Sequence, residues 1–144
     1  MSPALMITFS ELNLPAIGAA ALAYSAFCGM WHRQFAFGKK WENAMGFSRP
    51  VHWKETAIYY VVPSLSCWIT SFALFILFDL VKVTTLSQAF YLGLLAGIGF
   101  GSAVTFTNAV IPTMKRPLVF GSITGSGHAI GIVIAALLIF LIPD

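Results

Sequence analysis

The sequence predicts an all-α protein: a bundle of four transmembrane helices with antiparallel neighbours, and a short interfacial segment between the first two helices. Hydrophobic residues make up 58% of the 144 residues and charged residues only 9%, too few charges to cover a soluble globule of this size. The mean hydropathy is +0.85. Four apolar runs each reach the roughly 20 residues that a helix needs to cross a bilayer. Helices are predicted rather than strands because lipid cannot hydrate an open sheet edge.

The first span is expected over 12–31, with either Thr8 and Glu11 or Asn13 as candidate caps and Pro15 in an early turn. No Lys or Arg precedes this run, whereas a secretory signal has a basic start, so we expect the run to be retained. The other spans are expected over 56–78, 86–111 and 118–142. The links between the last three are short, so consecutive helices should be antiparallel neighbours in a single membrane domain over 1–144.

The cations predict the orientation of the chain. Seven of the eight Lys and Arg residues lie in the first and third links, and only Lys82 lies in the second. The positive-inside rule therefore places these two links in the cytoplasm and both termini outside, in a plasma (inner) membrane. The same cations do not form a face that could follow phosphates, so no nucleic-acid partner is expected.

The link 32–55 carries a short amphipathic segment that we expect to lie on the lipid headgroups. Trp41, Ala44 and Met45 share one face of a short helix, while Lys40 and Glu42 are expected to point away from it. Attraction to anionic lipid explains the charge of this link, and a docking surface for a partner is the alternative. Tryptophans at the same boundary indicate an aromatic belt; they are Trp31, Trp41 and Trp53.

A motif in this link, written W-x5-F-G-K-x-W-x4-G, follows a first helix rich in small residues. Its residues are Trp31, Phe37, Gly38, Lys39, Trp41 and Gly46. With the "GHAIG" stretch of the last span, it resembles a bacterial membrane family catalogued as domain of unknown function 1761. The resemblance covers nearly the whole chain. It implies four helices and a membrane location, and it implies no reaction.

His128 lies near the middle of the last apolar span, in the stretch "ITGSGHAIGI". At 100° per residue, it shares a face with small residues, namely Gly121, Thr124, Gly125, Gly131 and Ala135. Ile123 and the other bulky aliphatic residues fall on the far side, which we expect to face lipid, and Gly127 falls off the histidine face. His128 is therefore predicted to face another helix.

The third span carries a second stripe of small residues. Gly93, Gly97 and Gly101 recur every four residues, a pattern that lets membrane helices approach closely. Val104 and Asn108 are expected to continue this face. In an antiparallel hairpin with the last span, Gly101 should be level with His128 and Asn108 with Gly121.

Polar side chains on the inward faces predict one intramembrane polar layer. Its candidate members are Tyr24, Ser64, Cys67, Thr70, Thr105, Asn108 and His128. An ionisable residue inside a membrane is a functional candidate. However, one hydrogen bond to Thr105 or Ser64 could satisfy a neutral imidazole, so a structural role is the first interpretation of His128.

The sequence lacks enzyme and metal signatures. No carboxylate lies inside a span, and there is no HExxH motif, no second histidine within the spans and no Cys/His cluster. No catalytic residue, metal site or disulfide framework is therefore predicted. The glycine-rich stretches "GIGFG" and "GSITGSG" have no preceding strand and no Lys, so they are not interpreted as phosphate-binding loops.

Three functions remain open. The first is a non-enzymatic accessory, assembly or helix-packing subunit, a homo-oligomer or bound to a partner membrane protein. The second is a small oligomeric transporter or channel with Asn108 and His128 on its path. The third is a subunit that binds haem or a pigment through His128, with Gly101 making room; otherwise no cofactor is predicted.

Overall fold

The computed structural model describes residues 12–143 and is helical throughout, with no strand in this part of the chain. Its elements are α1 (Leu14–Trp31), α2 (Gly38–Met45), α3 (Ile58–Val81), α4 (Leu86–Ala96), a π-helical segment (Gly97–Ser102), α5 (Ala103–Ala109) and α6 (Pro117–Leu141). The helix from Leu86 to Ala109 is continuous. Together with α1, α3 and α6 it gives four helices that are long and apolar enough to cross a membrane. The predicted fold class is thus confirmed.

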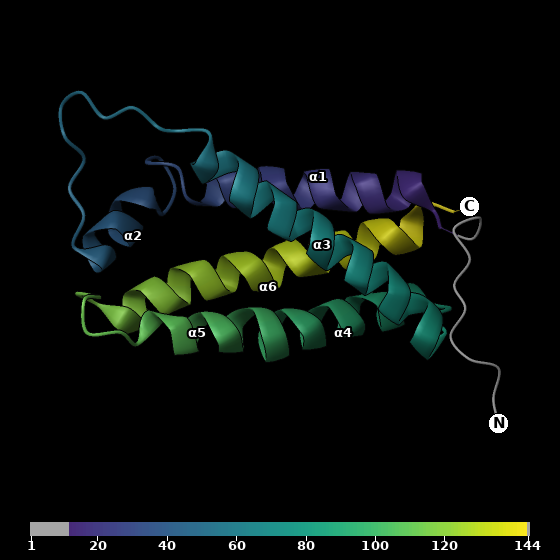
Figure 1. Ribbon diagram of the computed structural model, residues 1–144. Helices are drawn as coiled ribbons and strands as arrows, with labels where there is room; N and C mark the ends of the chain where they lie inside the picture. Colours follow the sequence, from purple (N-terminus) through teal and green to yellow (C-terminus); the bar gives the residue numbers. More distant parts are fainter. Residues whose placement is uncertain (1–11, 144) are drawn as a thin grey trace.

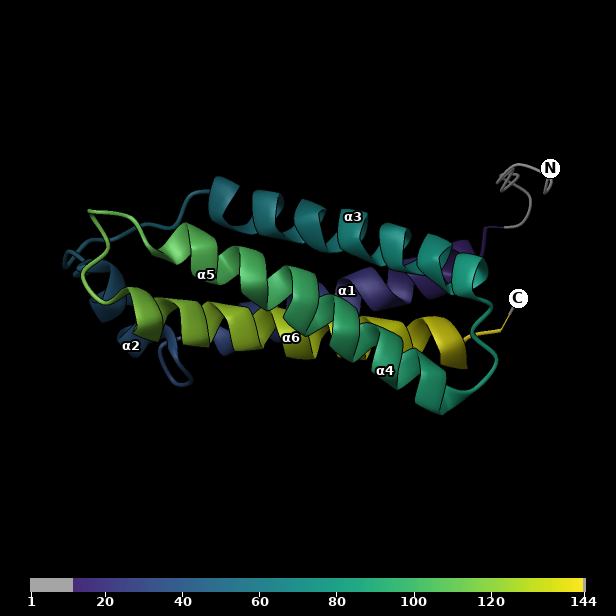
Figure 2. The same cartoon turned by 90° about the horizontal axis from the view of Figure 1, so that it is seen from below.

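Helix α6 is the central element of the bundle. It packs along α1 on one side and along α4 and α5 on the other, while α3 crosses at an angle (Figures 1 and 2). α1 begins and α6 ends at the same end of the bundle, and α2 lies at the opposite end. Asn13 secures the first end: its Oδ1 accepts from the Ala16 N–H, and its Nδ2 donates to the Ile142 carbonyl at 2.9 Å. The other candidate caps, Thr8 and Glu11, lie outside the described residues.

Glycines set the spacing between α4 and α6. A Cβ placed on Gly97 would lie 2.8 Å from the Ala129 carbonyl oxygen, and one on Gly93 would lie 2.7 Å from the Ala136 Cβ. A Cβ on Gly101 would lie 3.4 Å from the His128 Cβ. The antiparallel hairpin, and the level of Gly101 with His128, are therefore as predicted.

The π-helical segment Gly97–Ser102 changes which face of the third span meets α6. A π turn takes up an extra residue, so the contact moves from Gly97 to Ser102 and then to Phe106, whose ring covers Gly121. The prediction that Val104 and Asn108 continue the glycine face was wrong, because both are exposed beyond this wide turn.

The far side of α6 is also more covered than predicted. Ile123 is buried, and Gly127 lies directly under the Trp31 indole. Because α1 and α2 pack on this side near the start of α6, Ile123 does not face outward there. Ile130 and Leu141 further along the helix are exposed, as expected.

Substitution of Gly97 by Ala should destabilise the bundle by about 1–3 kcal/mol, because backbone atoms of Ala129 would have to move. Gly99, in the same π segment, is the matched control, since a Cβ there meets no atom within 4 Å. Reversible unfolding in detergent micelles measures both variants. Equal stability of Gly97→Ala and Gly99→Ala would contradict the close α4–α6 contact.

Candidate functional site

The centre of the candidate site is a hydrogen bond between α1 and α6. The Tyr24 phenol oxygen lies 2.7 Å from His128 Nδ1, and the two rings meet edge to face. Tyr24 is only 3% exposed. Its ring rests on Gly131, where any Cβ would overlap the ring carbons. Gly131 thus makes the space that brings the phenol to the imidazole.

Burial of Tyr24 determines which nitrogen of His128 carries the proton. The phenol forms no other hydrogen bond within residues 12–143, and a buried O–H needs an acceptor. It therefore donates to Nδ1, which assigns the proton of the neutral ring to Nε2. Nε2 forms no hydrogen bond to any described residue, and it is not among their fully buried unpartnered polar atoms. His128 thus presents an available N–H donor.

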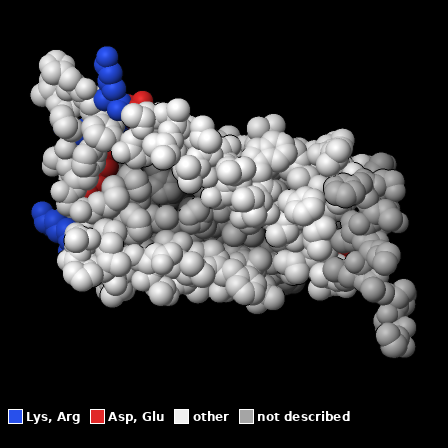
Figure 3. Space-filling view, viewed as in Figure 1, with Lys and Arg blue, Asp and Glu red and all other residues white. Residues whose placement is uncertain are grey.

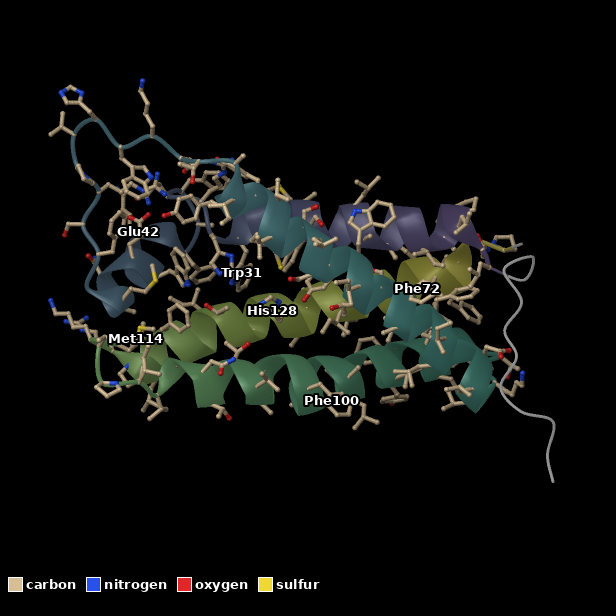
Figure 4. The ribbon with its side chains drawn as sticks, in the orientation of Figure 1. Trp31, Glu42, Phe72, Phe100, Met114 and His128 are labelled. Carbon is tan, nitrogen blue, oxygen red and sulfur yellow. The ribbon has the colours of Figure 1, made fainter. Side chains whose placement is uncertain are left out.

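Two indoles fasten the start of α6 to the end of α1 and to α2. Trp31 Nε1 donates to the Ile123 carbonyl and Trp41 Nε1 donates to Thr124 Oγ1, each at 2.9 Å. Trp31 and His128 both point into the space between the helices in Figure 4. These two tryptophans were predicted to form a belt at the boundary. Instead they turn inward and bind α6, because Gly127 leaves room for the Trp31 ring.

The remaining motif residues shape the link. A Cβ on Gly38 would overlap the carbonyl of His32, and Gly46 ends α2 with a φ of +79°, a conformation that favours glycine. Phe37 stacks near Trp31, with ring centroids 4.4 Å apart, while Lys39 is exposed.

Glu42 was predicted to point away from the packed face of α2, and this was wrong. It is 7% exposed, and its Oε1 accepts from Arg49 Nε at 2.6 Å. Arg49 also pairs with Glu55 at 3.1 Å, and Glu55 lies 3.6 Å from Arg33. The hydrogen bond from Arg49 to Glu42 raises the pKa of the guanidinium. This chain of ion pairs ties the link to the end of α1.

The structure brings only part of the predicted polar layer together. Ser64 pairs with Ser25 of α1 at 3.4 Å rather than with His128, and Thr105 donates to the Gly101 carbonyl of its own helix. Cys67 is buried in the apolar core, Thr70 is half-buried, and Asn108 is exposed.

Sequence reasoning missed one bond that joins the third span to α6. Ser102 Oγ donates to the Gly125 carbonyl at 2.8 Å, and the π turn that aims it there has no periodic signal in the sequence.

The space beside Gly101, where a haem or pigment ring would have to lie, is taken by α6 itself. A Cβ on Gly101 would lie 3.1 Å from Ile132 Cδ1. Within residues 12–143 there is also no group of three or more His, Cys, Asp and Glu side chains placed to hold a metal ion. The side chains of this site hold helices together and offer hydrogen bonds from neutral groups.

The four helices around this site are long and apolar enough to cross a membrane, which indicates a membrane protein. A family model described as protein of unknown function (DUF1761) matches residues 15–140, and the chain belongs to this family. The family that the tryptophan motif resembles is thus confirmed. Comparisons with curated proteins and with solved structures gave no match.

Replacing Tyr24 by Phe should lower stability by about 1–3 kcal/mol, because His128 Nδ1 then lies in the bundle without its donor. Tyr91→Phe on the exposed side of α4 is the control. Unfolding in micelles measures the loss, and ¹⁵N NMR of the imidazole reports the tautomer. A shift of the His128 tautomer is expected in Tyr24→Phe only; an unchanged ring would contradict the assignment.

Replacing Arg49 by Ala should leave Glu42 buried without its partner and loosen the link. We expect about 1–2 kcal/mol of destabilisation, reduced because Arg49 is partly exposed, and faster proteolysis between α2 and α3. Lys40→Ala is the control, since Lys40 forms no ion pair with any residue of 12–143. Equal cleavage rates in the two variants would show that the ion pairs do not order the link.

Proposed function

We propose that the chain is a non-enzymatic accessory or assembly subunit of a membrane, acting through helix contacts with a partner membrane protein or with a second copy. One observation carries this proposal. The polar side chains of the bundle centre are largely used to hold its own helices together, through Tyr24, Trp31, Trp41 and Ser102. Such bonds serve packing in lipid, where helices gain no hydrophobic energy from association.

The charge distribution supports a plasma-membrane orientation with both termini outside. Seven of the eight cations lie in the two links at the α2 end of the bundle. At the opposite end Lys82 pairs with Asp79 at 2.8 Å. A surplus of positive charge favours the cytoplasmic side, and anionic lipid then becomes the surrounding partner of the links.

The outer face of α4 is the surface that best fits a partner helix. A shallow, almost wholly apolar hollow there is lined by Tyr91, Leu94, Leu95, Ile98 and Gly99. Gly99 faces open space, and an outward glycine between bulky residues suits the close approach of a second membrane helix.

A photoreactive amino acid at Leu95 tests this role in native membranes. We expect one discrete adduct, either a dimer of this chain or a complex with a single membrane protein. Gly99→Trp should abolish it by filling the hollow while leaving the fold intact. A reactive group at Ile130 on α6 is the control. Lipid adducts alone at both positions would contradict the accessory role.

A small oligomeric transporter or channel is the second candidate, and a specific feature favours it. His128 Nε2 has no hydrogen-bond partner among the described residues, and Figure 4 shows His128 on α6 behind the opening between α3 and α5. For this function His128→Ala should abolish a measured flux of solute while leaving expression and folding unchanged. Tyr91→Phe serves as the control. Loss of the folded protein in His128→Ala would favour the packing role instead.

A further inference from the structure

A hollow lies between the first half of α3 and α5, on the side of the bundle seen in Figure 3. One face of α3 shows where it opens. Cys67 and Ser71 are buried on this face, Ser64 is half-buried one turn earlier, and Tyr60 is 49% exposed one turn before that. In its first half α3 meets α1, where Ser64 pairs with Ser25 at 3.4 Å, and within residues 12–143 it has no extended contact with α5.

The opposite wall belongs to α5. Thr105 lies one turn beyond Gly101, the residue that touches His128, and is half-buried. Asn108 lies almost one further turn along α5, off the face that meets α6, and is exposed. His128 and Trp31 lie at the bottom of the space between the two walls (Figure 4). The walls thus present hydroxyl and amide groups, and the floor presents the His128 N–H.

The hollow is closed toward the far end of the bundle. Beyond His128 the helices join in an apolar core, formed by Tyr24, Cys67, Leu74, Ile132, Ala135 and Ile139 among others. The open end is the one that carries α2 and the basic links. Solutes that enter at this end come from the side that the charge rule places in the cytoplasm.

Positive charge dominates the open end. Its two carboxylates, Glu42 and Glu55, are both engaged by arginines. Five further cations form no ion pair within residues 12–143; they are Lys39, Lys40, Lys54, Lys115 and Arg116. Figure 3 shows basic side chains at this end of the molecule. A cleft of one charge sign concentrates ions of the opposite sign.

We propose that this hollow is a water-filled vestibule that admits and binds small anions, with His128 Nε2–H as the donor at its floor. A lipid chain in the same place would leave the Asn108 amide and the imidazole N–H, which have no partner among the described residues, facing hydrocarbon. A small cation would be repelled by the basic side chains at the open end, and the N–H donor at the floor could not bind it. An anion finds attraction at the entrance and a hydrogen bond at the end.

This inference goes beyond the accessory role and does not depend on it. The docking surface lies on the outer face of α4, whereas the vestibule lies between α3 and α5. A negative result for the docking surface would not affect the vestibule, and the reverse also holds, because the two are tested at different residues.

Cysteine labelling tests the vestibule in the full chain in membranes. Single cysteines replace Thr105 or Ser64 in a Cys28→Ala, Cys67→Ala background and react with anionic or cationic methanethiosulfonates. We expect labelling at both positions, faster for the anionic reagent by on the order of 10-fold. Leu95→Cys, 68% exposed on α4, is the control and should react with neither. The same substitutions in the chain that keeps Cys28 and Cys67, with its own rate subtracted, provide an independent measurement.

The role of His128 is tested by inorganic sulfate as the probe anion. Sulfate should slow the labelling of Thr105→Cys by the anionic reagent. The effect should be at least about threefold larger in the chain that keeps His128 than in His128→Leu, because only His128 offers the N–H donor. Equal protection in both would remove His128 from the site. Unreactive Thr105→Cys and Ser64→Cys would mean that the space is dry, and equal or reversed rates for the two reagents would overturn anion binding.

Discussion

The close approach of α6 to its neighbours is the constraint on which the rest of the structure depends. Gly121 and Gly125 leave room for Phe106 and Ser102 on one side, while Gly127 and Gly131 leave room for Trp31 and Tyr24 on the other. In a membrane, an apolar side chain gains no hydrophobic energy by exchanging contact with lipid for contact with another helix. Helix association therefore rests on dispersion and hydrogen bonds. Both require short distances, and glycine is the residue that allows them.

Hydrogen bonds follow directly from this approach. Because nothing separates the Trp31 indole from the α6 backbone, it donates to the Ile123 carbonyl, and the Tyr24 phenol reaches His128 Nδ1 in the same way. Each bond gives a polar group a partner where water is excluded, and each fixes the rotation of α6 relative to α1. The phenol also fixes the tautomer of His128, so a packing contact determines the chemistry that the ring presents.

Much of the fold follows from periodicity alone. The four spans, the glycine register of Gly97 and Gly101 with α6, and the inward direction of His128 all come from spacing along straight helices. The π segment could not be predicted in this way, because its extra residue leaves no mark in the pattern. It therefore displaced Asn108 from the predicted layer.

The buried carboxylate shows a second limit of sequence reasoning. Periodicity treats a charge such as Glu42 as facing solvent, but the left-handed turn at Gly46 folds Arg49 back against it. That partner is visible only once the chain has reversed. The prediction for the tryptophans failed for a related reason. A boundary position indicates an aromatic belt, unless a helix distant in sequence offers a glycine under the ring, as α6 does for Trp31.

The shape of α3 explains why a hollow exists at all. This helix contains no glycine from Ile58 to Val81, so it approaches α6 closely only where its side chains are small. Cys67 and Ser71 meet that condition and lie in the buried part, whereas Tyr60 and Pro63 do not. The glycine face of α6 near Gly121 and Gly125 is already occupied by α5, so the first half of α3 leans on α1 instead. The space above His128 is thus a consequence of which helix carries the glycines.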